Sequence, residues 1–433
     1  MNPYSIIKLF NKTIIKSSPE NYIRNKLNFN KDILTIDKKK FKINKNISAI
    51  AFGKASSSMF KGLKNVVGIK NISEALIISH MEKLPHSTKK IEFVKSSHPY
   101  VSYKSYKAGK KILNFVRNMK ETNKLVVLVS GGGSAMISYP IENITFQKKK
   151  YFLSKLLVSG TPEREVNILR KSLSQIKGGG LAESSKSKEI INLILSDERS
   201  HKFDAISSGP TIYSPGINPN QIIKKYNLKN LVPNELKIFY SSFDIKIARG
   251  KNKNIENFLI GSREEFIDDF SKLSLQHGIK KIYKLPNKFT NDPLKFSSYL
   301  NKKFKYIYNK APLGEHFILS SGEIQVKINE QVKKSKGGRN QHLTACMMLQ
   351  KKFDFEFVFL AIGTDGTDYI DGISGAFFSS RNMNYVNNNK KNIKNYIKSQ
   401  NTYKLHKKLG TLIKSKKTGH NVSDIFIFYF KKI

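Results

Sequence analysis

The sequence predicts an α/β protein of two or three domains, and two observations lead to that fold class. The chain has 433 residues, which is more than a single hydrophobic core usually supports. Short apolar runs alternate along it with stretches of helical apolar spacing, a pattern typical of sheets covered by helices. No internal repeat interrupts this alternation.

The first half of the chain contains four runs that we predict to be buried parallel strands. Each run is continuously apolar and ends at Gly, Ser or Asp, as strands covered on both faces do. The runs are 48–53, 74–79, 125–130 and 191–196. Between the second and third runs, apolar residues recur at helical spacing over 103–120, which predicts a helix there.

Residues 213–235 contain three prolines and little strand signal, so we place the domain junction near the end of this segment. The predicted domains are therefore 1–235 and 236–433. The second domain is expected to contain a further set of strands. The runs that predict them are 257–262, 316–323, 325–329, 356–366 and 425–430.

The net charge of +45 raises the question of a nucleic-acid partner. Only nine of the 77 basic residues are arginine, and the lysines are spread along the chain beside abundant Asn, Ile, Phe and Tyr. This spread favours compositional drift on solvated faces over a nucleic-acid groove, while attraction of small anionic substrates remains a third interpretation. We expect no nucleic acid as a partner.

The sequence also predicts a cytoplasmic protein without a membrane partner. No apolar run approaches the length that spans a bilayer. The first twenty residues carry lysines inside their apolar stretch and show no small-residue cleavage site, unlike a signal peptide. The single cysteine, Cys346, cannot form an internal disulfide.

The stretch SGGGS at 130–134 is the strongest local signal of a binding site. It directly follows the apolar run 125–130, and ligands of open α/β sheets bind at the carboxyl ends of strands. Its glycines would let backbone N–H groups surround an anion, and Ser130 and Ser134 would add hydroxyl donors. A tight turn without a ligand would also use glycines. The candidate binding residues here are Ser130, Gly131, Gly132, Gly133 and Ser134.

Candidate cations follow other glycine-rich turns. Lys54 comes just after the strand 48–53 and could neutralise phosphate charge, although it could also be an ordinary surface lysine. Lys177 precedes three glycines, in a stretch that also contains Arg170 and Lys171. Arg339 follows two glycines, and its alternative roles are to cap a helix or to pair with a nearby Asp.

Acidic residues follow two of the predicted strands. Asp197 directly follows the run 191–196, a position suited to a metal ligand or a base. Asp365 lies at the end of the run 356–366, and Asp368 and Asp371 follow it. Anion-binding glycine loops, fixed cations and carboxylates are the groups that phosphoryl transfer requires. The sequence contains no Walker A pattern, no HExxH and no zinc-ligand spacing.

These motifs resemble the glycerate 2-kinase family, whose older label is hydroxypyruvate reductase. The resemblance covers nearly the whole chain in order, and nine motifs carry it. They are AFGKASSSM, SHP, SGGGSA, LRKSLSQIKGGGLAE, LSD with ISSGPT, SSGE, GGRNQ, GTDGTD and TGHNVSDIFI. No dinucleotide fingerprint supports the reductase label.

The resemblance implies a larger Rossmann-like domain with a parallel sheet, a smaller C-terminal MOFRL-like α/β domain and a cleft between them. It implies ATP-dependent phosphorylation of D-glycerate to 2-phosphoglycerate by a monomer or homodimer, with Mg²⁺. It makes Lys54 and Arg339 the principal catalytic cations. Because these two residues lie in different predicted domains, we expect them to converge when the domains close. The further catalytic candidate is Asp197, and the further substrate or phosphate ligands are Lys177, Gly338 and Asn340. We expect a divalent metal at Asp197 or at Asp365 and Asp368.

The chain departs from the family pattern at several positions, which leaves the acceptor open. The departures are Ser172, Gly180, Ser200, His201, His342 and Asp371, together with 261–263. Two alternatives follow from them. The chain could be a kinase of another small hydroxy acid or sugar acid, or a catalytically weakened relative that binds a metabolite.

Overall fold

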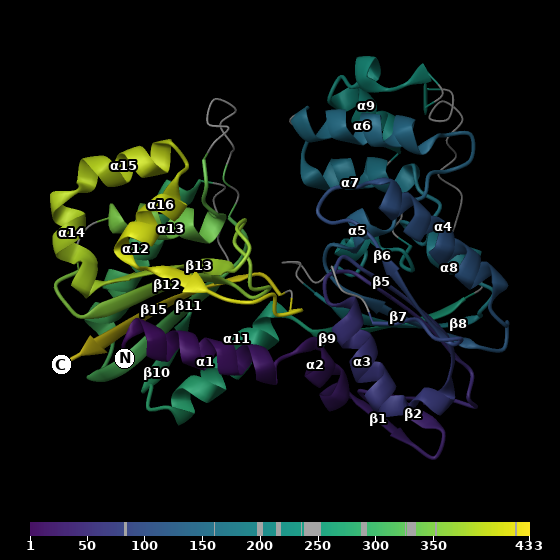
Figure 1. Cartoon of the computed structure of the whole chain (residues 1–433), viewed down its shortest axis with the longest axis horizontal. Helices are drawn as coiled ribbons and strands as arrows, with labels where there is room; N and C mark the ends of the chain where they lie inside the picture. Colours follow the sequence, from purple (N-terminus) through teal and green to yellow (C-terminus); the bar gives the residue numbers. More distant parts are fainter. Residues whose placement is uncertain are drawn as a thin grey trace. The chain divides into compact units, whose positions relative to one another are not determined.

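The computed structural model describes residues 1–81, 85–159, 161–196, 202–213, 218–234, 236–237, 253–286, 292–324, 326, 335–350, 353–420 and 422–433. The chain forms two compact units (Figure 1). One unit is Pro19–Gly261, and the other combines Met1–Ser18 with Ser262–Ile433. Each unit has its own sheet and its own hydrophobic core, so each is described by itself.

The unit Pro19–Gly261 is built on a parallel sheet, which in the described part of the chain has six strands in the order β6-β5-β4-β7-β8-β9. Every neighbouring pair in this sheet is parallel. The strands are β4 (Ile47–Phe52), β5 (Ile72–Ser79), β6 (Ile91–Lys95), β7 (Lys124–Val129), β8 (Glu189–Leu195) and β9 (Asn254–Gly261). The four strands predicted in the first half of the chain are confirmed.

The two central strands of this sheet are almost completely covered. All six residues of β4 are buried, and in β7 only the first is partly exposed. Helices α3 (Ser56–Val67) and α4 (Tyr103–Asn118) lie on opposite faces of the sheet (Figure 1). The predicted helix at 103–120 is therefore confirmed as α4, and a capping box at Ser102 fixes its first turn.

A separate helical layer and a small sheet complete this unit. Helices α6 (Phe146–Val158), α7 (Glu163–Ser172) and α9 (Pro219–Lys225) share a hydrophobic cluster of their own. Short helices α2 (Pro19–Lys26), α5 (Gly133–Met136) and α8 (Gly180–Ser184) join the loops. Strands β1 (Leu27–Asn30), β2 (Ile33–Ile36) and β3 (Lys39–Lys42) form an antiparallel sheet that the sequence analysis did not predict.

The other unit contains a mixed sheet, with the order β10-β11-β15-β12-β13-β14 in the described residues. Only the β10–β11 pair is parallel, and the remaining pairs are antiparallel. The strands are β10 (Lys281–Lys284), β11 (Gly314–Ser321), β12 (Phe357–Gly363), β13 (Ile373–Ser379), β14 (Leu412–Lys414) and β15 (Asp424–Lys432). The predicted strands at 316–323, 356–366 and 425–430 are confirmed as β11, β12 and β15, whereas 325–329 falls mostly outside the described residues.

Helices cover this mixed sheet, and one of them comes from the start of the chain. Helix α1 (Pro3–Lys16) packs on α11 (Arg263–Gln276), where the rings of Phe10 and Phe266 lie 5.4 Å apart. The remaining helices are α12 (Pro293–Lys310), α13 (Arg339–Met348), α14 (Met383–Asn388), α15 (Lys390–Lys398) and α16 (Thr402–Leu409).

The two units divide the chain at places other than the expected junction between residues 235 and 236. The assignment of 257–262 to the second set of strands is wrong, because this segment forms β9 and pairs with β8 in the parallel sheet. At the other end, α1 belongs with Ser262–Ile433 through its contact with α11. Among the described residues, no helix is both long and apolar enough to cross a membrane.

Candidate functional site

The candidate site in the parallel-sheet unit begins where β4 and β7 end side by side. The backbone N–H of Lys54 donates to the carbonyl of Gly131 at 2.9 Å, and that of Ala55 donates to Ser130 Oγ at 3.0 Å. Gly53 has φ of +112°, and a Cβ there would lie 2.3 Å from Ser130 Oγ. Only glycine fits this close approach, which holds the two strand-end loops together.

Gly132 lies between two side chains that could act on a ligand. It has φ of +83°, and a Cβ on it would lie 2.8 Å from His98 Nε2 and 3.3 Å from Lys54 Cγ. The Lys54 stem therefore passes directly beside the glycine loop. Among the described residues, none accepts a backbone hydrogen bond from the N–H groups of Gly131 or Gly132. The loop can thus present these donors to an anion.

A third loop supports the glycine loop from the side. Ser207 donates its hydroxyl to the carbonyl of Ser130 at 2.9 Å, and a Cβ on Gly133 would meet the Ser207 hydroxyl. The hydroxyls of Ser134 and Ser208 are 2.6 Å apart, and Ser208 also donates to Asn167 Oδ1 at 2.8 Å. The segment ISSGPT (206–211) therefore lines the same candidate site.

Two buried lysines, Lys177 and Lys149, lie behind the glycine loop. Lys177 donates from Nζ to the carbonyl of Ser134 at 2.8 Å and is only 4% exposed. Burial lowers the pKa of Lys177 well below its ordinary value, and the charges of Lys149 and Arg170 lower it further. Lys149 on α6 is 1% exposed, and its Nζ donates to the carbonyl of Tyr139 at 3.3 Å. Burial lowers the pKa of Lys149 to about 7.

In the other unit, Arg339 is the first residue of α13 and forms a forked ion pair. Its Nε and Nη2 donate to the two carboxylate oxygens of Asp424, at 3.0 Å for Nη2 to Oδ1. Nη2 also donates to Glu323 Oε1 at 3.0 Å. Of the two alternative roles considered for Arg339, the structure shows the pairing with an Asp, and this pairing does not conflict with a role in substrate binding.

Burial and charge act against each other in this pair. Burial by itself lowers the pKa of Arg339, but Asp424 and Glu323 raise it, so the pKa is well above its ordinary value. Burial raises the pKa of Asp424, while the guanidinium of Arg339 opposes that rise. Arg339 therefore stays charged, and Asp424 fixes the orientation of its planar fork.

Asp368, a predicted metal ligand, is engaged with the start of α13. Its carboxylate accepts from the backbone N–H groups of Asn340 at 3.1 Å and Gln341 at 3.0 Å, and from Gln341 Nε2 at 3.0 Å. A Cβ on Gly338 would lie 2.1 Å from Asp368 Cγ, so Gly338 makes room for the carboxylate. Burial and Asp424 raise the pKa of Asp368 to about 6, against the hydrogen bonds that lower it. The Asp368 carboxylate thus caps the first turn of α13, where Gly338 is the N-cap residue and Asn340 donates its backbone N–H.

Asp365, the other predicted metal ligand, lies close to Asp424. Its Oδ1 accepts from the N–H of Thr367 at 3.0 Å, and a Cβ on Gly363 would lie 3.3 Å from both Asp365 Oδ1 and Asp424 Oδ1. Within the described residues, no group of three or more His, Cys, Asp or Glu side chains could hold a metal ion. Asp197 lies outside the described residues.

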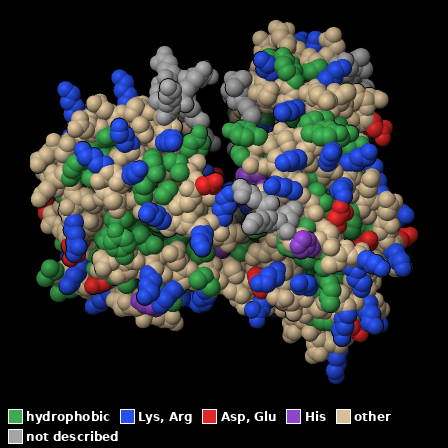
Figure 2. Space-filling model, in the orientation of Figure 1, with side chains coloured by type: hydrophobic (Ala, Val, Ile, Leu, Met, Phe, Trp, Pro, Cys, Tyr) green, Lys and Arg blue, Asp and Glu red, His purple; other side chains and the backbone are tan. Residues whose placement is uncertain are grey.

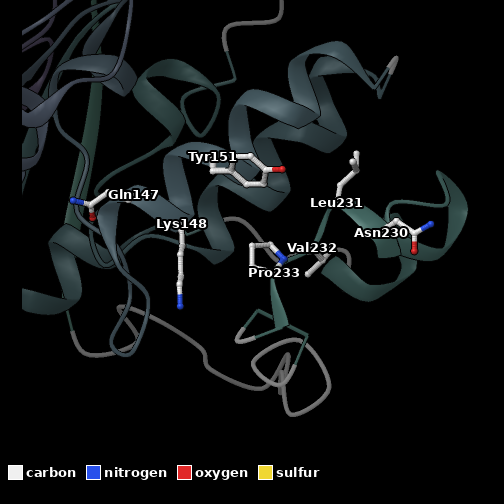
Figure 3. Close-up of a pocket in the computed structure, with 7 residues that line it drawn as sticks. All are labelled: Gln147, Lys148, Tyr151, Asn230, Leu231, Val232 and Pro233. Carbon is white, nitrogen blue, oxygen red and sulfur yellow. The ribbon is translucent and has the colours of Figure 1, made fainter.

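A pocket elsewhere in the parallel-sheet unit contains none of the predicted site residues. It has a volume of about 390 Å³ and lies between α6 and the segment that follows α9 (Figure 3). Its lining residues are Gln147, Lys148, Tyr151, Asn230, Leu231, Val232 and Pro233.

The positive charge of the chain is not gathered in one place on the face shown in Figure 2. Lysine and arginine side chains are scattered over that face.

The sequence analysis missed four residues that contribute to these arrangements. His98 belongs to the SHP motif but was given no role of its own, and its position beside Gly132 is set by a long-range contact. Ser207 and Ser208 lie in a turn that was noted without a role. Asp424 lies in the motif TGHNVSDIFI, but no role was predicted for it. Two features of the sequence could have pointed to these residues. A proline follows His98, and Asp424 begins the last strand, β15.

Comparison with known proteins gives two family matches. Residues 5–240 match the family described as a domain of unknown function, DUF4147, and residues 316–424 match the MOFRL family. A glycerate 2-kinase of Sulfurisphaera tokodaii is 30% identical, over 97% of this chain and 98% of its own. A glycerate 2-kinase of Pyrococcus horikoshii is 26% identical, over 97% of this chain and 96% of its own.

Solved structures agree with the fold. A crystal structure of a Pyrococcus horikoshii protein has a TM-score of 0.79 at 25% identity, covering 100% of this chain and 99% of its own. The crystal structure of a glycerate kinase from Thermotoga maritima has a TM-score of 0.79 at 23% identity, with 98% of each chain covered. The α/β fold with two sheets is thus shared along the full length.

Proposed function

Because this chain belongs to the glycerate 2-kinase family, and is therefore a kinase, we propose that it phosphorylates D-glycerate with ATP. The proposed product is 2-phosphoglycerate. The observation that carries the proposal is the approach of Lys54 to the glycine loop, where a Cβ on Gly132 would lie 3.3 Å from Lys54 Cγ. A fixed ammonium group beside unobstructed backbone donors suits a phosphoryl or carboxylate group.

The chemistry of phosphoryl transfer explains why these groups would be sufficient. The transferred group passes through a state whose charge is spread over its oxygens, so positioning and charge neutralisation supply most of the catalysis. The amides of Gly131 and Gly132 would hold one anionic group, and Lys54 would neutralise the charge that develops. Arg339, held by Asp424, would bring a second fixed cation with a planar fork for carboxylate or phosphate.

We also propose Mg²⁺ as the cofactor, entering with the nucleotide phosphates, since Mg²⁺ usually keeps several waters and few protein ligands. Asp365 fits a ligand role through its carboxylate near Asp424. Asp368 does not fit, because its oxygens accept three N–H groups at the start of α13. The assignments of Asp365 and Asp197 stay predictions, and no catalytic step is derived through the metal.

The test is ADP release from the purified full-length chain with ATP, with and without D-glycerate. Enolase added without phosphoglycerate mutase should then form phosphoenolpyruvate, because only 2-phosphoglycerate is its substrate. Phosphoenolpyruvate that appears only after the mutase is added would point to 3-phosphoglycerate instead. A panel of other hydroxy acids and sugar acids tests the alternative acceptors, and excess chelator should abolish turnover.

A further inference from the structure

Lys149 is a buried cation whose place in the fold calls for a counter-ion. It is 1% exposed on α6, and the acceptor of its ammonium group is the carbonyl of Tyr139 at 3.3 Å. Within the described part of the chain, no carboxylate forms an ion pair with it. A buried ammonium group without an opposite charge is costly, so such groups are either neutral or matched by an anion.

Lys149 is connected to the candidate site through one carbonyl group. The carbonyl of Tyr139 also accepts from Ser174 Oγ at 3.3 Å and from the N–H of Gln175 at 3.3 Å. Ser174 Oγ in turn accepts from the N–H of Lys177 at 3.3 Å. Lys149 therefore lies behind the turn that carries Lys177, and Lys177 contacts the last residue of the glycine loop through the carbonyl of Ser134.

We propose that Lys149 and Lys177 form a two-cation floor beneath the glycine loop that holds a carboxylate, phosphate or sulfate-like anion at Ser134. The proposal rests on the proposed function of that loop and deepens it. Lys177 would contact the anion, whereas Lys149 would act through Lys177 as a positioning residue that adds charge from behind. The half-buried Arg170 would contribute a third positive charge at the same place.

Binding of an anion should change the protonation state of Lys149 and Lys177. The pKa of Lys149 is lowered to about 7 by burial, so near neutral pH a substantial fraction of this lysine is uncharged in the free protein. Among the described residues, the charged groups that lower the pKa of Lys177 are Lys149 and Arg170. An arriving anion stabilises the charged form and raises the pKa of both lysines, so binding should take up protons from solvent.

The experiment is calorimetric titration of the full-length protein with D-glycerate and, separately, with sulfate, at pH 8 in buffers of different ionisation heat. Neither probe changes its own charge near this pH, so the buffer dependence reports proton uptake by the protein. Wild-type protein should take up protons, and its affinity should fall as pH rises above about 7. Lys149→Met should lose part of that uptake and bind roughly tenfold more weakly at pH 6.5.

Two controls separate charge from packing. Lys150→Met changes an exposed neighbour on the same helix and should behave as wild type. Lys149→Arg keeps the charge and should retain more affinity than Lys149→Met, but it should show less proton uptake because arginine stays protonated. Circular dichroism and melting curves identify any variant that fails to fold, in which case Lys149→Arg still provides the test.

Each outcome decides the proposal. Equal proton uptake and affinity in Lys149→Met and Lys150→Met would overturn it, as would binding without uptake in the wild type or no binding of either probe. If sulfate binds with the expected uptake while D-glycerate does not, the anion floor stands and the proposed acceptor fails. If glycerate is phosphorylated normally by Lys149→Met with unchanged proton uptake, the acceptor stands and the floor fails.

Discussion

Lys54 contacts the glycine loop through both its backbone and its side chain. Its backbone is bonded to Gly131, and its stem passes beside Gly132. A cation that acts on developing charge contributes to the transition state more than to substrate binding. We therefore predict that Lys54→Met lowers kcat by at least about tenfold, or roughly 1.4 kcal/mol, with a smaller rise in KM.

The control for this prediction is Lys70→Met, which removes an exposed lysine on the helical turn after α3. Steady-state kinetics of both variants, with melting temperatures to confirm folding, give the comparison. Equal kcat values for Lys54→Met and Lys70→Met would remove Lys54 from the catalytic groups.

Asp424 illustrates which site residues a sequence cannot supply. Lys54 and the SGGGS loop were predictable because each follows an apolar run directly, so local pattern fixes its place at a strand end. Asp424 meets Arg339 across 85 positions of chain, and His98 meets Gly132 through tertiary contact alone. The engagement of Asp368 with α13 was equally hidden, because nothing local distinguishes a helix-capping carboxylate from a metal ligand.

The Arg339–Asp424 pair gives a second prediction at the scale of residues. Lysine in place of Arg339 can satisfy only one of the two Asp424 oxygens, and asparagine in place of Asp424 removes the charge that holds the fork. We predict that Arg339→Lys lowers kcat/KM at least about a hundredfold, or roughly 2.7 kcal/mol. Asp424→Asn should lower it less, and the double variant should be no worse than Arg339→Lys alone.

The measurement is a double-mutant cycle on kcat/KM, with unfolding by urea followed in the same four proteins. Because the pair is partly buried, both single variants should also unfold at lower urea concentration. Additive kinetic losses would show that Asp424 does not act through Arg339. Loss of stability with unchanged kinetics would assign the pair a purely structural role.

At the scale of elements, the parallel strands were predictable and the strands of weaker pattern were not. β4 and β7 are continuous apolar runs with nearly complete burial. β6 has a single buried residue, Ile91 at its start, and β3 has none, so neither leaves an apolar run in the sequence. β9 was recognised as a strand but assigned to the wrong sheet, because strand pairing depends on contacts far along the chain.

The loop after β7 gives a prediction at this scale. Any side chain at Gly132 would have to adopt φ of +83° and would press against His98 Nε2 at 2.8 Å. We predict that Gly132→Ala lowers kcat/KM by about a hundredfold or more, because the loop must shift away from its anion-binding shape. Gly410→Ala is the matched control, since Gly410 is also in the left-handed region, with φ of +65°, and has open space around it.

Both variants carry similar backbone strain, so both should lower the melting temperature by a similar amount. Only Gly132→Ala should lose activity and anion binding, measured by kinetics and by calorimetry with sulfate. Full activity in Gly132→Ala would mean that SGGGS is a turn without a ligand.

At the scale of the whole molecule, the chain crosses between its two units twice, after Ser18 and after Gly261. The sequence at neither crossing has the composition of a linker. The domain boundary was therefore predicted at the proline-rich segment 213–235 instead. The two units also differ in their buried histidines. His342, His406 and His420 are buried in the unit that contains the mixed sheet, whereas His80 and His98 of the other unit are only partly buried.

This difference predicts that mild acid destabilises one unit selectively. Burial lowers the pKa of His342, His406 and His420 to about 4 each. A histidine whose folded pKa lies below its unfolded value of about 6.5 binds fewer protons when folded, so stability is complete above about pH 6.5 and is lost as pH falls toward 4. At pH 5 each histidine should cost about 2 kcal/mol.

Hydrogen exchange at pH 7 and pH 5, corrected for the intrinsic pH dependence of exchange, measures the effect in each sheet separately. Amides of β12 and β15 should lose protection at pH 5, while those of β4 and β7 should change little. His406 Nε2 contacts the carbonyl of Gln341 at 2.9 Å and Nδ1 contacts Thr411 Oγ1 at 2.8 Å, so His406→Gln keeps a polar group there without a titrating one. That variant should lose less protection between pH 7 and pH 5 than the wild type. Equal loss in the two sheets would contradict the prediction, because a general acid effect does not distinguish the unit with the buried histidines.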